Sequence, residues 1–182
     1  GRGREEARAS GKSWRLHGVE LRHKAMFEDY TARCEYPANL WSANFAYLWA
    51  DAQSDRKTAM WRIVDGMLVP FVRLRGAGLH VHCLPLGPGS PERVADVVAA
   101  CMKYCDGWNR RFGYGPATLR TLNGQQLEFL MRAGRFDKTF EVKKLNGLER
   151  HFSIDKITRL EGKDFSQVRY HINRFKRDYP QA

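Results

Sequence analysis

Hydrophobic residues recur at helical spacing in the first part of the chain. Good helix formers without Gly or Pro fill 20–33 and predict a first helix, which ends before Pro37. Trp41, Phe45 and Trp49 follow at intervals of four, which favours a second helix with an aromatic face. We expect this face to pack into the core; a wall on which a ligand stacks is the alternative.

Three apolar runs at short intervals predict an antiparallel β-meander. They cover 58–64, 67–74 and 79–84, and the Asp-Gly pair at 65–66 is a strong signal for a two-residue hairpin turn. The middle run is apolar on both alternating faces, which predicts a central strand covered on both sides. Pro70 lies inside it and has no N–H to donate, so we expect a bulge or an irregular ladder there.

Helical periodicity returns after a Pro/Gly-rich loop at 85–90. Apolar residues three and four apart give one face to a long helix over 91–112, for which Ser90 is the expected N-cap. The later elements we expect are a strand over 117–122, a helix begun by Asn123 with Gln126, a strand over 139–143, a helix over 154–160 capped by Ser153, and a last helix over 165–179 begun by Asp164 with Gln167. The order predicts an α/β fold with a mixed, mainly antiparallel sheet and helices on both faces.

Length and composition limit the class of protein. The 182 residues suit one domain, and a hydrophobic content of 43% is enough for a core. No run approaches the ~20 apolar residues that cross a bilayer, and no secretion signal opens the chain. We therefore expect a cytoplasmic protein, with peripheral membrane contact as an alternative. Residues 1–13 have little to bury and are expected to form a disordered or added tail, followed by a folded lobe over 14–162 and a basic helix over 163–182.

The chain carries a formal charge of +11. Such an excess favours polyanionic partners, among them RNA, anionic lipid headgroups, nucleotides and coenzyme A; a merely solvated basic surface is the alternative. The loop at 85–90 joins a strand to a helix and could direct backbone N–H groups at a phosphate, with Gly87 and Gly89 among the donors. A plain strand-to-helix connection explains the same residues.

The last predicted helix is the second candidate for anion binding. Its apolar residues form one narrow stripe: Phe165, Val168, Ile172, Phe175 and Tyr179. Beside and ahead of the stripe lie polar and cationic residues that could hold a phosphate-rich donor or an RNA backbone: Lys163, Arg169, Asn173, Arg174 and Lys176. A solvated basic face is the alternative, and the stripe also suits docking onto a partner domain.

The sequence gives less support to a metal site or a catalytic nucleophile than to anion binding. His80 and His82 share one face of the predicted strand, but zinc needs a third ligand and Cys83 is expected on the opposite face, so we predict hydrogen-bonded or surface histidines and no metal site. The four cysteines have no zinc-ligand spacing and are expected as small buried hydrophobes. No nucleophile elbow, Walker A loop or zinc-protease motif occurs. Acyl transfer from a thioester or ester to an amine needs no protein nucleophile and is compatible with the chain.

The final segments resemble a known family. The pattern L-x-G-K-x-[YF]-x-x-x-R-x-x-I-N-x-F falls on Leu160, Gly162, Lys163, Phe165, Arg169, Ile172, Asn173 and Phe175. It resembles bacterial proteins similar to the C-terminal domain of phosphatidylglycerol lysyltransferase, and weaker likenesses extend the resemblance over 36–180. The resemblance implies a GNAT-like lobe and transfer of an acyl or aminoacyl group, with acyl-CoA or aminoacyl-tRNA as donor and a lipid headgroup, amine or hydroxyl as acceptor.

The family continues into a second lobe after the basic helix. The resemblance therefore implies that these 182 residues are the first lobe alone, with the apolar stripe meant for the second lobe or for a homodimer partner. The competing hypothesis is a non-catalytic basic module that binds RNA or an anionic membrane surface.

Overall fold

The described chain forms two compact units. The computed structural model describes residues 14–145 and 154–180, and contacts divide the chain between Glu141 and Val142. The predicted tail at 1–13 and the predicted cap Ser153 lie outside the described residues.

A four-stranded antiparallel sheet forms the centre of the first unit. Its strands are β1 (His17–Gly18), β2 (Lys57–Val64), β3 (Met67–Leu74) and β4 (Gly78–Val81), in that order across the sheet. Val64 pairs with Met67, so Asp65 and Gly66 form the predicted two-residue turn, with positive φ angles of 48° and 73°. The central position predicted for β3 is confirmed, and its residues from Met67 to Val72 are buried.

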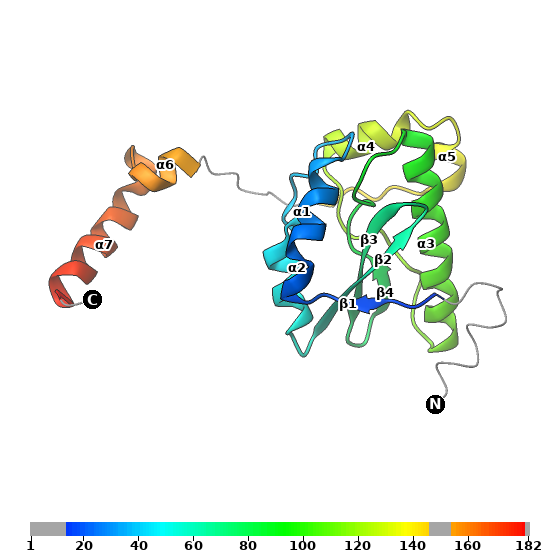
Figure 1. The fold of residues 1–182 in the computed structure, drawn as a ribbon, viewed down its shortest axis with the longest axis horizontal. Coiled ribbons are helices and arrows are strands. Elements are labelled where there is room, and N and C mark those ends of the chain that lie inside the picture. The colour runs from blue at the N-terminus through cyan, green and yellow to red at the C-terminus, as the bar shows by residue number, and fades with distance from the viewer. Residues whose placement is uncertain (1–13, 146–153, 181–182) are drawn as a thin grey trace. The chain divides into compact units, whose positions relative to one another are not determined.

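Helices cover both faces of this sheet, as predicted (Figure 1). On one face lie α1 (Lys24–Ala32), which follows the 3₁₀ turn η2 (Leu21–His23), and α2 (Phe45–Ala52), which follows η3 (Trp41–Ala43). On the other lies α3 (Pro91–Arg111), with α4 (Gly124–Met131) and α5 (Phe136–Thr139) beside it. Ser90 caps α3 and Asn123 with Gln126 forms a capping box at α4, both as predicted. The fold is a mixed α/β architecture.

Two apolar clusters fill the space between the layers. One joins the α3 face of the sheet to α4 and α5, and the other joins the opposite face to α1 and α2. Cys101 and Cys105 lie in the first and Cys83 in the second, all buried as free thiols, while Cys34 is half-buried. Burial raises the pKa of the Cys101 thiol to about 12. The prediction of small buried hydrophobes is therefore confirmed for three of the four.

Three local predictions are wrong. Asn44 is extended and caps α2 through its side chain, so Trp41 lies in a separate turn from Phe45, and Trp49 is exposed. The 117–122 segment pairs with β4 through a single bridge instead of forming a strand. The 139–143 segment is not a strand: α5 ends at Thr139, and the tilted rings of Phe136 and Phe140 lie 5.4 Å apart across its last turn.

The second unit contains α6 (Ile154–Arg159), the 3₁₀ turn η4 (Lys163–Phe165) and α7 (Ser166–Asp178). The last helix thus exists, but neither Asp164 nor any other side chain caps its start. Its apolar stripe is not covered by its own unit: Val168, Ile172, Phe175 and Tyr179 are all exposed. Among the described residues, no helix combines the length and apolar character that crossing a bilayer requires.

Candidate functional site

β4 leaves its neighbour β3 through a bulge. Phe71 pairs with Val81 in the regular ladder, and the next pair is Leu68 with Leu86. Leu68 is three residues before Phe71, whereas Leu86 is five residues after Val81. The β4 side therefore carries two extra residues over this stretch. Pro70 stands opposite the bulge, where His82 N–H donates to the Pro70 carbonyl at 2.9 Å. The irregular ladder predicted at Pro70 is confirmed.

β4 also separates at this point from the 118–120 segment, which runs parallel to it on its other side. Val81 N–H donates to the Thr118 carbonyl at 3.1 Å, and Arg120 N–H donates to the Val81 carbonyl at 3.0 Å. Beyond this bridge, backbone pairing between the two segments stops within the described residues. We call the stretch 82–86, where β4 has left both neighbours, the β4 opening.

Backbone donors lie unused at the β4 opening. Within the part of the chain that the structure describes, the amides of Cys83 and Leu84 have no hydrogen-bond partner. Both residues are buried. Buried amides without partners are rare in folded proteins, and each of these two N–H groups is free to donate to a ligand oxygen.

His82 is the second unusual group at the opening. Its side chain is only 4% exposed, and neither ring nitrogen has a hydrogen-bond partner among the described residues. The imidazole and the ring of Trp41 meet edge to face, with centroids 5.5 Å apart. The prediction of a hydrogen-bonded or surface histidine is therefore wrong for His82. A buried imidazole without partners is a destabilising feature that calls for an explanation.

His80 provides the contrast on the same strand. Its Nε2 lies 3.0 Å from the Ala77 carbonyl, to which it donates, and its Nδ1 accepts from Thr118 N–H at 3.2 Å. Both nitrogens are therefore satisfied, as predicted, and this ring ties β4 to the 118–120 segment. Among the described residues, no three His, Cys, Asp or Glu side chains cluster as metal ligands do.

Burial holds His82 in the neutral form. Desolvation is the main cause that lowers its pKa from 6.5 to about 4. The charges of Lys57 and Arg120 lower the pKa further, and the carboxylate of Asp51 raises it. At pH 7 the ring is thus an imidazole able to accept a proton.

Hydroxyl groups connect the opening to η3, the turn that precedes α2. The Thr121 hydroxyl lies 2.8 Å from Ser42 Oγ and 3.3 Å from the His82 carbonyl. If Ser42 donates to Thr121, the Thr121 proton is available for the carbonyl, and one chain of bonds joins the three residues. The Tyr36 hydroxyl similarly donates to the Pro85 carbonyl at 2.8 Å. The opening is therefore held by side chains in place of a sheet ladder.

Packing accounts for the two predicted phosphate-binding glycines. Gly87 has a φ of 120°, and its N–H donates to the Cys34 sulfur at 3.2 Å. A Cβ on Gly89 would lie 2.2 Å from Cε of Met67. Both glycines are buried, and the N–H of Leu86 is used in the bridge to Leu68. Close approach thus explains the loop's conformation, and the N–H of Gly87 is used within the protein, whereas the N–H of Gly89, like those of Cys83 and Leu84, has no partner among the described residues.

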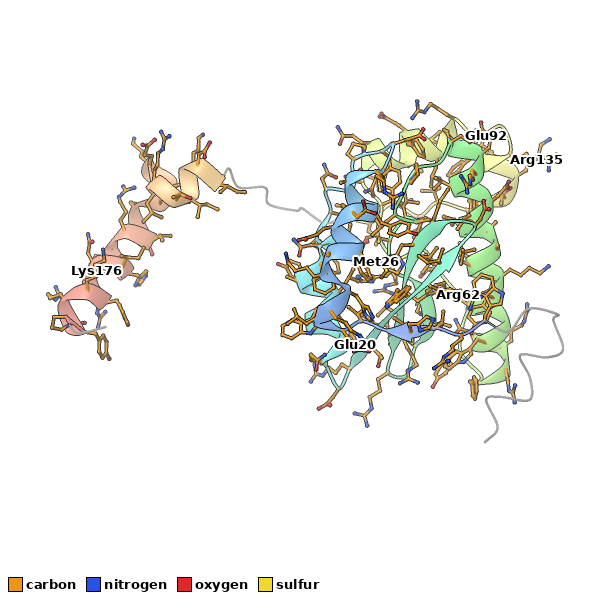
Figure 2. All side chains as sticks on the ribbon, in the orientation of Figure 1. Glu20, Met26, Arg62, Glu92, Arg135 and Lys176 are labelled. Carbon is orange, nitrogen blue, oxygen red and sulfur yellow. The ribbon has the colours of Figure 1, made fainter. Side chains whose placement is uncertain are left out.

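The remaining predicted residues lie in the second unit. Arg169 is tied down, because its guanidinium donates to the carbonyls of Leu160 and Gly162. Arg174 pairs with Asp178 at 3.4 Å. Lys163, Asn173 and Lys176 are exposed, and Lys176 extends from α7 (Figure 2). The predicted donor-binding residues are therefore divided between two units.

Sequence reasoning missed three parts of the site. Cys83 and Leu84 contribute backbone groups, which residue types do not reveal. For His82 the sequence predicts a hydrogen-bonded or surface residue, and nothing in its pattern indicates a buried imidazole without partners. The one signal available was Pro70, whose missing N–H marks the place where the ladder fails.

Comparison with known proteins yields no relative. No family model matches the chain, and no curated protein and no solved structure gives a significant match.

Proposed function

We propose that the first unit is a GNAT-like lobe that transfers an acyl or aminoacyl group. The donor is an acyl-CoA or an aminoacyl-tRNA, and the acceptor is an amine or a hydroxyl. The observation that carries the proposal is the β4 opening, where unpaired amides lie next to a buried, neutral imidazole. An antiparallel meander, a helix and a parallel return segment meet at this point.

The chemistry of acyl transfer fits these groups. A carbonyl oxygen that accepts from the amide of Cys83 or of Leu84 becomes polarised, and the negative charge that develops on it during attack is stabilised. The Cys83 thiol is no candidate nucleophile, because burial raises its pKa and disfavours the thiolate. Direct attack by the acceptor, with His82 accepting the proton, requires no covalent intermediate on the protein.

The experiment is a comparison of donors with and without the acyl group. We expect acetyl-CoA or a lysyl-tRNA to bind by calorimetry at least tenfold more tightly than coenzyme A or the uncharged tRNA, because the carbonyl supplies the contact with the amides. Equal affinity for acylated and unacylated forms of both donors would remove the proposal. The comparison is made at one ionic strength, since phosphate contacts alone weaken with salt.

A second function is favoured by the second unit. The exposed apolar residues of α7 adjoin exposed cations, a combination typical of helices that bind an anionic surface, and this supports a non-catalytic module for RNA or anionic membrane. Its affinity should fall steeply with salt without preference for acylated tRNA. Exchanging Lys163 and Lys176 for Gln should lower the salt slope by about 2, whereas the same charge change at Lys103 and Lys138 in the first unit should leave it unchanged.

A further inference from the structure

Aromatic side chains follow one another along the C-terminal half of α3. Tyr104, Trp108 and Phe112 are spaced by four residues, about one helical turn, so they lie in one row along the helix and its C-cap. The rings of Trp108 and Phe112 lie 4.5 Å apart between centroids. Phe112 is 54% exposed, and the other two residues are half-buried. The row therefore lies at the border of the core, with aromatic surface open to solvent.

Two further rings widen this row. Trp14 stacks on Tyr104 with centroids 4.7 Å apart, and Tyr114 lies parallel to Trp108 at 5.8 Å, with 3° between the ring planes. Both added residues are half-buried. We call the five residues the aromatic platform: Trp14, Tyr104, Trp108, Phe112 and Tyr114. All of them belong to the first unit.

Two arginines lie over rings of the platform. The guanidinium carbon of Arg62 is 5.1 Å from the ring centre of Trp14, and that of Arg111 is 5.6 Å from the ring centre of Phe112. A guanidinium carries several N–H donors in one plane, so it can contact an aromatic face and a phosphate group together. The platform is thus bordered by groups that favour an anionic ligand.

The charge around the platform is cationic. Arg73 is exposed and lies on the same face of β3 as Phe71, whose ring meets that of Tyr104 at 6.5 Å between centroids. The only acidic residue in the last two turns of α3 is Asp106, and its carboxylate accepts from Ala117 N–H at 2.6 Å. The charge of this surface is therefore complementary to a polyanion.

We propose that the aromatic platform binds single-stranded nucleic acid, with bases stacked on its rings and phosphates held by Arg62, Arg73 and Arg111. A duplex hides the faces of its bases, whereas a single strand can place them on exposed aromatic rings. An acidic peptide or a polyphosphate would use the arginines alone. Because stacking and charge read every base alike, we expect little dependence on base sequence. The inference goes beyond acyl transfer and does not depend on it.

Exchanges at Phe112 test the stacking. The probe is a fluorescently labelled oligoadenylate of about ten nucleotides, and its affinity for the whole chain is measured by fluorescence anisotropy. Phe112→Leu keeps an apolar side chain and removes the aromatic face, whereas Phe112→Trp keeps an aromatic face. We expect Phe112→Leu to bind about tenfold more weakly than wild type and Phe112→Trp to bind at least as tightly. The matched control is Tyr47→Leu in α2, where the side chain is similarly exposed, and it should have no effect.

Exchanges of arginines test the phosphate contacts. Arg73→Gln combined with Arg111→Gln should lower the slope of log affinity against log salt concentration by about 1–2, whereas Phe112→Leu should leave the slope unchanged. Arg135→Gln combined with Lys138→Gln removes the same charge at exposed residues of the first unit outside the platform. This control should leave the slope as it is in wild type.

Three results would overturn the inference. They are equal affinity of wild type and Phe112→Leu, equal affinity for oligoadenylate and inorganic polyphosphate, and tighter binding of a duplex than of a single strand. A dimer in sedimentation that Phe112→Leu dissociates, without a change in oligoadenylate affinity, would assign the platform to a second copy of the chain and also overturn it. If Phe112→Leu does not melt cooperatively, Phe112→Met takes its place.

The outcome is separate from both proposed functions. The probe carries no acyl group, so the result does not depend on acyl transfer. The titrations are repeated with Lys163→Gln and Lys176→Gln in the second unit. The same loss from Phe112→Leu in both backgrounds would support the platform, whereas a loss that follows the two lysines alone would overturn it and support binding by the second unit.

Discussion

Replacing the buried imidazole of His82 should change how stability depends on pH. The variant is His82→Leu, which keeps a side chain of similar size and removes both unpartnered nitrogens. The folded pKa of about 4 lies below the ordinary value of 6.5 that we assign to the unfolded chain. Between these two values the unfolded state binds more protons, so the free energy of unfolding falls as the pH falls.

The size of the effect follows from the two pKa values. The interval from 6.5 to about 4, at 1.36 kcal/mol per unit, gives a loss of about 3 kcal/mol between pH 7.5 and pH 4. The stability that neutral His82 supports is complete above pH 6.5 and disappears as the pH approaches 4. At pH 7.5 the variant should be about 1–3 kcal/mol more stable than wild type, because it no longer buries unsatisfied polar atoms.

Urea unfolding followed by tryptophan fluorescence measures both effects. The difference in unfolding free energy between His82→Leu and wild type is taken at several pH values, so that the other titrating groups cancel. His80→Leu is the matched control on the same strand: it breaks satisfied hydrogen bonds and should destabilise the protein by about 1–3 kcal/mol at pH 7.5. Curves for wild type and His82→Leu that run parallel from pH 7.5 to pH 4 would refute the reasoning.

Four substitutions test the fold and the site further. Gly107→Ala, in an open and exposed position of α3, should stabilise the protein by about 1 kcal/mol, whereas Gly89→Ala should destabilise it by about 1–3 kcal/mol through its contact with Met67; thermal melts compare the two. Asn109→Ala should lower the unfolding free energy by about 3 kcal/mol in urea titrations, since the amide bonds both backbone groups of Leu79 and the carbonyl of Gly115; only a small change would contradict this. With donor and amine present, His82→Leu should lower kcat about 100-fold and leave KM for the amine nearly unchanged, measured as steady-state product formation; an unchanged kcat would show that His82 takes no proton.

Local chemistry in the sequence predicted those elements that depend on neighbouring residues. The Asp-Gly turn at 65–66 needs only the positive φ that these residues adopt readily, and the caps at Ser90 and Asn123 bond within one helical turn. The helix predicted through Trp41, Phe45 and Trp49 failed because Asn44 uses its side chain to begin α2. The four-residue spacing of the aromatics is typical of a helix, but the cap at Asn44 lies between Trp41 and Phe45 and separates the two residues into different elements.

The site depends on distant residues, and the sequence could not place them. The unpartnered ring of His82 meets that of Trp41, which lies 41 residues earlier in the chain. The opening is held by Thr121 and Ser42, which are 79 positions apart. Contacts between residues so far apart in the chain produce no periodic pattern in the sequence. The cations of the last helix were predicted as residue types, but the use of Arg169 to bond carbonyls within its own unit follows only from coordinates.

One missing amide explains why the opening lies where it does. In an antiparallel ladder, Pro70 and His82 would exchange two hydrogen bonds, but Pro70 has no N–H, so only the bond from His82 to the Pro70 carbonyl forms. The His82 carbonyl is left for the Thr121 hydroxyl, which draws the parallel segment to this residue and no further. The chain beyond is held by neither neighbour and bulges until Leu86 pairs with Leu68. The unpaired amides of Cys83 and Leu84 thus lie where a single residue in the central strand interrupts the ladder.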